Sequence, residues 1–389
     1  MSIDKALFPI AGKEMLYHPI AACSRVPGLK EVYVLGYFPG EQFTTFIENT
    51  SKELNIKITY LQEEKPLGTA GGLFHFGQVI TKGREYFFVL HVDVCCSFPL
   101  VQLLNCHKQR ASQFCVTMMG TKVDKVAAPT YGCYVADENG KMVHYAEHPE
   151  SFISNTINAG VYVFNCSVVT RKFIKKKTDP YNLLRKSFDF QEDDEVISME
   201  RDLLPGLVNE GKLCAFEYND FWRSIKNPGG AVYANDQYMK WYMNTKAIQL
   251  TTPQTAKCEV VGDVIIHSSA QVDPSAKIGP NVYIGPNTTV GAGARVHNSI
   301  VLNNVKIKEH ACVMYAIIGN DSIVGIWSRV EGLPNATDAI VEGRDTRFRR
   351  LGITVIGNGV TVHPEIIIRN CIVMPHKPIK ATVVDEIIL

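Results

Sequence analysis

The sequence lacks the features that would place this chain in a membrane or a secretory route. It holds no run approaching the roughly 18 apolar residues that a membrane-spanning helix needs, and no basic stretch followed by an apolar segment opens it. It also lacks an excess of charge, because 40 lysines and arginines face 39 aspartates and glutamates, a net charge of +1. Such a chain offers no general attraction to polyanions or anionic lipids. We therefore expect a cytoplasmic protein that binds neither nucleic acid nor membranes.

Cysteine spacing excludes two further classes of structure. The eleven cysteines are odd in number and include no Cys-x-x-Cys pair, which is the spacing that structural zinc sites use. We expect free thiols distributed through packed cores rather than a disulfide framework.

What the sequence does contain is enough length and apolar content for two domains, with 389 residues of which 46% are hydrophobic. Up to about residue 250, short apolar runs alternate with amphipathic stretches, which is typical of a wound parallel sheet. We assign residues 1–250 to this α/β domain. Its expected strands lie at 32–35, 57–61, 86–90 and 161–164, and its expected helices at 41–54, 71–81 and 99–110.

The pattern changes in residues 258–389. Aliphatic side chains recur there about every six positions, separated by glycine, proline and asparagine. Hexapeptide repeats of this kind are typical of a left-handed parallel β-helix, in which each aliphatic side chain points inward. The repeat includes Ile266, Val272, Ile278, Ile284, Val290, Val296, Ile307, Val313, Ile318, Val324, Val330, Ile356, Val362, Ile368 and Met374.

A polar segment interrupts the repeat at residues 331–352 and is too polar to fit inside a coil. It carries Arg344, Arg347, Arg349 and Arg350. A protruding basic loop can contact a partner or a phosphate, or it can be a solvated insertion. We interpret it as a candidate regulatory loop.

Four short motifs carry a resemblance to a known family. They lie at residues 5–12 (KALFPIAG), 66–72 (PLGTAGG), 158–162 (NAGVY) and 370–377 (NCIVMPHK). Together with the order of the two domains, they make nearly the whole chain similar to the sugar-nucleotide pyrophosphorylases, most closely to the regulatory alpha subunits of mannose-1-phosphate guanylyltransferase. The resemblance implies a Rossmann-like nucleotidyltransferase domain followed by the β-helix.

For the nucleotide, the resemblance implies a site around the glycine-rich loop. Glu63 stands where the family reads the base, and a carboxylate can accept from both N1–H and the N2 amino group of guanine, which suits GTP or GDP-mannose. Lys5 matches a phosphate-facing lysine, and Asp93 matches the aspartate that holds Mg²⁺ in the family. The nucleotide-binding residues implied are Lys5, Glu63, Pro66, Gly68, Thr69, Gly71 and Asp93.

For the sugar, the resemblance implies contacts from Gly132, Glu147 and Asn158. These three residues match positions that touch the hexose in the family. At the next position His148 replaces a usual lysine, so the expected sugar site is only partly kept.

Two parts of the family's catalytic machinery have no match. The second metal-binding aspartate is replaced by Ser224, whose neutral hydroxyl is a poor magnesium ligand, so the Mg²⁺ site is incomplete. The sequence also starts at the tail of the family's phosphate-binding loop, without its glycines and without the first, central strand of the sheet. We expect upstream coding sequence to encode both.

These gaps predict a regulatory subunit with weak or no catalysis. It would bind GDP-mannose or GTP, form homo- or hetero-oligomers, and control a catalytic beta subunit of mannose-1-phosphate guanylyltransferase. Three alternatives stay open: an active guanylyltransferase making GDP-mannose from GTP and mannose-1-phosphate, a hexapeptide acyltransferase using His297 or His310, and a non-catalytic subunit of a translation initiation exchange factor.

Overall fold

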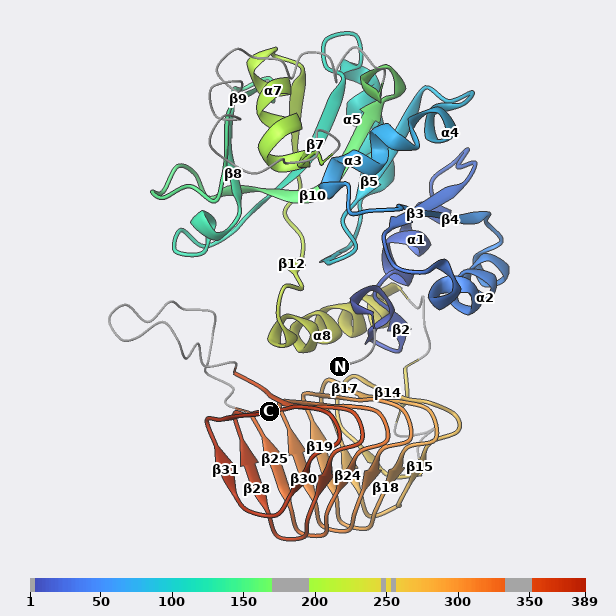
Figure 1. Cartoon of the computed structure of the whole chain (residues 1–389), viewed down its shortest axis with the longest axis vertical. Helices are drawn as coiled ribbons and strands as arrows, with labels where there is room; N and C mark the ends of the chain where they lie inside the picture. The colour runs from blue at the N-terminus through green and yellow to red at the C-terminus, as the bar shows by residue number, and fades with distance from the viewer. Residues whose placement is uncertain (1–3, 170–195, 246–249, 253–256, 333–351) are drawn as a thin grey trace. The chain divides into compact units, whose positions relative to one another are not determined.

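The chain divides into two units whose segments alternate along the sequence. The computed structural model describes residues 4–169, 196–245, 250–252, 257–332 and 352–389 (Figure 1). The α/β unit holds residues 19–91 and 97–222, and the β-helix unit holds residues 1–18, 92–96 and 223–389. These units reflect packing, whereas the limits 1–250 and 258–389 reflect sequence pattern, so those domain limits stay a prediction.

A mixed six-stranded sheet forms the centre of the α/β unit. Strand β10 runs antiparallel to β5, β7 and β8, whereas β11 and β7 are parallel. The sheet is therefore not wholly parallel as expected, because short connections such as 137–141, between β8 and β9, join antiparallel neighbours. The strands are β5 (Tyr86–Leu90), β7 (Val116–Lys122), β8 (Gly132–Ala136), β9 (Met142–Glu147), β10 (Thr156–Asn165) and β11 (Leu213–Glu217).

A separate parallel pair, β3 (Val32–Gly36) and β4 (Ile58–Gln62), belongs to the same unit. Among the strands of the described ranges, none joins this pair to β5. The apolar residues of β3 are only half-buried, although a run such as Val-Tyr-Val-Leu is typical of a strand covered on both faces.

The helices expected in this unit are confirmed with small changes at their ends. The first begins with a 3-10 turn, and the second is broken at Phe76 into two shorter helices. The helical segments of the unit are η2 (Gly40–Phe43), α2 (Thr44–Leu54), α3 (Gly68–His75), α4 (Gly77–Thr81), α5 (Leu100–Arg110), η3 (Ala128–Thr130), η4 (Cys166–Val169), η6 (Met199–Leu203) and α7 (Leu204–Asn209).

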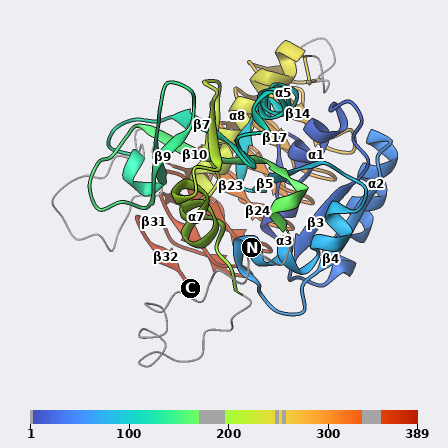
Figure 2. The same ribbon diagram turned by 90° about the horizontal axis from the view of Figure 1, so that it is seen from above.

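Three parallel sheets form the stacked coils of the second unit (Figures 1 and 2), consistent with a left-handed parallel β-helix. Each strand pairs in register with the strand one coil further along the chain. The first sheet holds β13 (Glu259–Val260), β16 (Lys277–Ile278), β19 (Arg295–His297), β22 (Cys312–Met314), β25 (Arg329–Glu331), β28 (Ile367–Arg369) and β31 (Val383–Val384). The second holds β14 (Val264–Ile266), β17 (Val282–Ile284), β20 (Ser299–Val301), β23 (Ala316–Ile318), β26 (Thr354–Ile356), β29 (Ile372–Val373) and β32 (Ile387–Ile388). The third holds β15 (Gln271–Val272), β18 (Thr289–Val290), β21 (Lys306–Ile307), β24 (Ile323–Val324), β27 (Thr361–Val362) and β30 (Pro378–Ile379).

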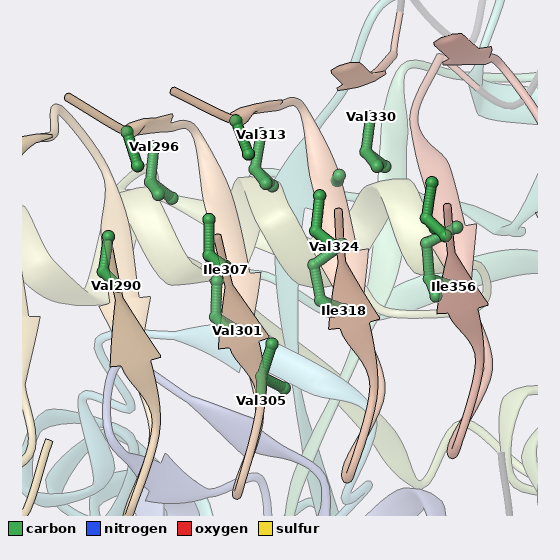
Figure 3. Close-up of a cluster of buried hydrophobic side chains, with 14 of the residues drawn as sticks. Val290, Val296, Val301, Val305, Ile307, Val313, Ile318, Val324, Val330 and Ile356 are labelled. Carbon is green, nitrogen blue, oxygen red and sulfur yellow. The ribbon is translucent and has the colours of Figure 1, made fainter. Parts of the chain in front are cut away.

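The aliphatic side chains of the repeat fill the interior of these coils in rows (Figure 3). One expected member, Met374, is 40% exposed, and Val373 fills the interior position instead. The reason is a corner one residue shorter than the six-residue count, where Asn370 adopts a left-handed backbone conformation with φ 52°.

An 18-residue helix that the sequence reading did not predict, α8 (Pro228–Thr245), packs against β17, β20 and β23 of the coils. The N-terminal segment of the same unit contributes η1 (Lys5–Leu7), the hairpin of β1 (Pro9–Ile10) and β2 (Lys13–Glu14), and the start of α1 (Tyr17–Ser24), and β6 (Val94–Cys96) pairs with β12 (Trp222–Ser224). No helix in the described part of the chain is both long and apolar enough to span a membrane.

Candidate functional site

Glu63, which follows strand β4, contacts the glycine-rich loop of residues 66–72 in the α/β unit. Its backbone N–H donates to Gly36 O (2.8 Å), and its carboxylate Oε2 accepts from Leu67 N–H (3.2 Å) just before helix α3. A Cβ on Gly72 would fall inside contact distance of Glu63 Oε1. The carboxylate expected to read the base is therefore nearly buried, 8% exposed, and seated in a space that glycine provides.

The rest of the loop is fixed by the segment around helix η6. A Cβ on Gly68, whose φ is +78°, would lie 2.6 Å from Ile197 O. The Thr69 hydroxyl accepts from Met199 N–H (2.7 Å) and donates to Glu200 Oε2 (2.7 Å). Both residues thus serve contacts within the chain, while Pro66 is exposed and Gly71 is buried in α3.

The three expected sugar-binding residues lie together at one end of the six-stranded sheet. Gly132 of β8 pairs in register with Glu147 of β9, and Glu147 Oε2 accepts from Tyr145 OH (2.7 Å). Asn158 Nδ2 donates to Tyr162 OH (2.8 Å) and to Tyr145 OH (3.3 Å). Burial raises the pKa of Tyr145 and of Tyr162 above its ordinary range, so both hydroxyls stay neutral donors.

The replacement His148 lies beside this cluster, with its Nε2 3.1 Å from Glu147 Oε1. The imidazole thus lies at the carboxylate that the resemblance assigns to the sugar.

A further pair of residues connects the loop to the sugar cluster. His91 Nε2 lies 3.6 Å from Glu200 Oε1, the carboxylate that binds Thr69, and the His91 ring lies 5.6 Å from that of Tyr162. Sequence reasoning missed His91, Glu200 and the two tyrosines. The sequence could have indicated His91, since it lies two positions before the candidate Asp93. It could not have indicated Glu200, because Glu200 is 131 residues from Thr69, the residue that it contacts.

The expected phosphate and metal residues belong to the β-helix unit. Lys5 Nζ lies 3.1 Å from Asp93 Oδ2 in an ion pair whose side chains are 49% and 28% exposed. Asp93 O accepts from Ile225 N–H (2.7 Å), so Ser224 lies in the strand segment next to Asp93. Within the described ranges, no three histidine, cysteine, aspartate or glutamate side chains gather as metal ligands. The described structure thus places one carboxylate, paired with an ammonium group, at this position, and the incomplete Mg²⁺ site stays a prediction.

The remaining candidates stand apart from these groups. Arg344, Arg347, Arg349 and Arg350 lie outside the described residues. In the coils, the His310 ring stacks on Trp327 at 4.3 Å, and burial lowers the pKa of His297.

Comparisons with known proteins agree with this arrangement. Residues 1–200 match the family model described as nucleotidyl transferase, and residues 260–389 match the one described as GMPPB C-terminal domain. The chain is 44% identical to the mannose-1-phosphate guanylyltransferase regulatory subunit alpha of Dictyostelium discoideum, over 100% of this chain and 94% of that one. It is 39% identical to regulatory subunit alpha-B of Danio rerio with the same coverage.

The chain belongs to this family of mannose-1-phosphate guanylyltransferase alpha subunits. A probable mannose-1-phosphate guanyltransferase of Schizosaccharomyces pombe is 37% identical, again over 100% and 94% of the two chains. A putative glucose-1-phosphate thymidylyltransferase of Bacillus anthracis superposes with a TM-score of 0.49 at 16% identity, covering 64% of this chain and 89% of that one. The family resemblance that the four sequence motifs indicated is therefore confirmed.

Proposed function

We propose that this chain is a regulatory subunit that binds GDP-mannose and restrains a catalytic beta subunit of mannose-1-phosphate guanylyltransferase, with little or no turnover of its own. The names of its relatives support a regulatory role beside a catalytic partner. The observation that carries the proposal is the unequal state of the candidate residues: the base loop and the sugar cluster are assembled, whereas Asp93 is paired with Lys5 and has Ser224 where a second carboxylate belongs.

The assembled groups have the donors and acceptors that a guanine nucleotide sugar needs. A carboxylate has acceptor capacity beyond the bond that Glu63 accepts from Leu67 N–H, and guanine offers two adjacent donors. Glu147, Asn158 and neutral tyrosine hydroxyls can exchange hydrogen bonds with the hydroxyls of a hexose. This supports GDP-mannose, or GTP for the nucleotide alone, as the bound molecule.

Catalysis would need more than these groups provide. Transfer of a nucleotidyl group is promoted mainly by positioning and by cations or backbone amides that stabilise the charge developing on the phosphates. The alternative function, an active guanylyltransferase, predicts turnover by the chain alone. The ion pair of Lys5 and Asp93 does not support that prediction.

Calorimetry on the full chain tests the binding step. We expect GDP-mannose to bind, and Glu63→Gln to weaken it about tenfold because the amide cannot accept from both guanine donors. Glu309→Gln, an exposed glutamate in the coils, is the matched control and should leave the affinity unchanged. If GDP-mannose does not bind the wild-type chain, the proposal fails.

Turnover measurements with GTP, Mg²⁺ and mannose-1-phosphate separate the two candidate functions. The chain alone should form little GDP-mannose, and a co-purified catalytic beta subunit should be slowed further when GDP-mannose is added. Efficient turnover by the chain alone would establish the active enzyme instead.

The basic loop supplies the proposed contact with the partner. Four arginines within seven residues, at positions 344–350, form a dense positive segment in an otherwise neutral chain. Replacing all four by alanine should keep GDP-mannose binding but abolish the inhibition of the partner. Inhibition that survives the replacement would exclude the loop.

A further inference from the structure

Trp327 is the most exposed aromatic side chain in the described part of the chain, at 60% exposure. It lies at a corner of the coils, between β24 and β25, in a left-handed backbone conformation with φ 59°. That conformation suits glycine and is unfavourable for a bulky residue. Folding alone therefore gives no reason for a tryptophan here, and an outlier of this kind points to a function.

The neighbouring coils fix the ring of Trp327 and leave one of its faces open. His310, at the same corner of the preceding coil, stacks on the ring with centroids 4.3 Å apart and planes at 18°. His310 in turn fills the space over Gly293, where a Cβ would lie 2.5 Å from the His310 Nδ1. Because His310 covers one face, the opposite face of the indole is turned toward the following coil. That coil places Glu365 at the same corner, where its N–H donates to Ile326 O (2.9 Å).

The charges at this corner suit a cation over the open face. Glu365 is exposed, and within the described ranges its carboxylate forms no ion pair. Trp327 N–H donates to the carbonyl oxygen of Glu309 (3.1 Å), which places a second glutamate beside the ring. Segments 308–310, 325–327 and 363–365 together carry these two carboxylates and the ammonium of Lys308, a net charge of −1 when the histidines are neutral.

Other aromatic rings of the chain bind cations over one face. The cation lies 4.5 to 5.7 Å from the ring centroid in the pairs Lys13–Tyr17, Arg84–Tyr33, Lys125–Phe152 and Arg223–Tyr233. Tryptophan is the ring type that binds cations best, yet none of the described cations lies over Trp327. A cation from another molecule can therefore approach this ring without displacing one that belongs to the chain.

We propose that the Trp327 corner binds an arginine side chain on an exposed segment of a partner protein. The guanidinium stacks on the open face of the indole and donates to the Glu365 carboxylate at its edge. Arginine fits better than lysine, because its planar fork can stack on a ring and give two parallel N–H donors to one carboxylate. The inference goes beyond the proposed function, since it concerns a surface of the coils and needs neither the nucleotide nor residues 344–350.

The size of the corner favours one anchoring side chain over a second copy of this chain. Three coils extend only about 10 Å along the stack, because neighbouring strands lie about 4.8 Å apart. A stable dimer buries about 800 Å² on each partner, which is several times such a patch. A patch of this size is enough for a single arginine anchor within a larger interface.

The test is ¹⁹F NMR of the full chain labelled with 5-fluorotryptophan and titrated with the peptide acetyl-Gly-Arg-Gly-Arg-Gly-amide. The three tryptophans give three resonances, and the one lost in Trp327→Gly belongs to Trp327. We expect this resonance to shift and to saturate in the millimolar range, whereas the resonances of Trp222 and Trp241 stay in place. The same peptide with citrulline, an uncharged isostere of arginine, should bind about fivefold more weakly. The lysine peptide should also bind more weakly than the arginine peptide.

Two variants separate binding from folding. Glu365→Gln should weaken the arginine peptide about threefold, because an exposed ion pair is lost, and the matched control Glu386→Gln, an exposed glutamate of the last coil, should bind as the wild type does. Trp327→Gly should abolish peptide binding but keep the melting temperature within a few degrees, because glycine suits this corner as Gly293 does two coils earlier. A large fall in melting temperature would assign the tryptophan to folding instead.

Three further results would overturn the inference. Equal affinity for the arginine and citrulline peptides would show that charge is not recognised, and equal affinity for the lysine peptide would remove the reason for a guanidinium. A Trp327 resonance that shifts with protein concentration alone would identify the corner as a contact between copies of this chain. None of these results bears on GDP-mannose binding, so the proposed function is tested separately.

Discussion

Gly72 shows that a glycine in a ligand-binding motif can be required by the protein's own packing. It lies inside helix α3, where alanine would normally be favoured by about 1 kcal/mol. A Cβ there would meet the carboxylate of Glu63 and the side chain of Leu35. The resemblance places this glycine in the loop of the expected nucleotide site, but in the structure it also leaves room for the side chains of Glu63 and Leu35.

We predict that Gly72→Ala lowers the melting temperature, at a cost of about 1–3 kcal/mol from overpacking. In a Glu63→Ala background the cost should become small, because the added methyl group then has room. Gly206→Ala in helix α7 is the control, since nothing lies within 4 Å of its Cβ position, and it should be neutral or stabilising. Equal losses in both backgrounds would contradict the steric explanation.

The buried environment of His18 sets the pKa of its imidazole. Its Nε2 lies 3.0 Å from Ile10 O, its Nδ1 accepts from Tyr242 OH (2.6 Å), and its ring stacks on Tyr238 at 3.9 Å. Burial lowers the pKa of His18 from 6.5 to about 3, so the folded protein holds it neutral.

Between pH 6.5 and pH 3 the unfolded chain therefore binds a proton at His18 that the folded chain does not bind. This group destabilises the fold by about 1.4 kcal/mol for each pH unit below 6.5. We predict that the fall in melting temperature between pH 7 and pH 5 is smaller in His18→Gln than in the wild type. His144→Gln, an exposed histidine, should keep the full pH dependence. A pH dependence unchanged in His18→Gln would refute the assignment.

At the scale of elements, helix η6 and the glycine-rich loop behave as one structure. Ile197 O accepts from Ala70 N–H (2.9 Å), Leu67 O accepts from Ile197 N–H (2.9 Å), and the Thr69 hydroxyl joins the same segment. The loop is thus held by a part of the chain more than a hundred residues away.

Thr69→Val keeps the shape of the side chain but removes both of its hydrogen bonds. We expect amide hydrogen exchange at residues 66–72 to become about thirtyfold faster, because two bonds are lost and each is worth about 1 kcal/mol. Thr81→Val is the control, since its hydroxyl donates to Gly77 O within its own helix (2.7 Å). Unchanged exchange in Thr69→Val would show that η6 does not hold the loop.

The elements also show what the sequence could predict. The coils could be predicted because they arise from a repeat, in which inward side chains recur about every six residues. The pattern failed at a shortened corner, the one at Asn370. Helix α8 was missed because it is buried on much of its surface and has no narrow apolar face to reveal it. The clamp of the loop by Glu200 depends on a long-range contact that no local pattern contains.

At the scale of the whole molecule, the packing units do not follow the order of the chain. Residues 92–96 belong with the β-helix unit although the strand before them, β5, lies in the sheet of the α/β unit. Motif matching found Lys5 and Asp93 separately, because each resembles a family position, but their ion pair is a property of the folded unit.

The distribution of thiols is the whole-molecule property that the sequence predicted best. All eleven cysteines are free. Burial raises the pKa of nine of them, to about 12 for Cys23 and well above 9 for Cys95, so little thiolate exists at neutral pH.

We therefore predict that a thiol reagent such as Ellman's reagent titrates only a minority of the cysteines of the native chain rapidly, and all eleven in guanidinium chloride. Reductant should leave the melting temperature unchanged, because no disulfide constrains the unfolded chain. Cys106 is the internal control, since it is only partly buried whereas Cys23 is buried, so Cys106→Ser should lower the rapid titration while Cys23→Ser should not. Rapid reaction of all eleven in the native state, or a disulfide in the unreduced protein's peptide map, would show that the thiols are not held in packed interiors.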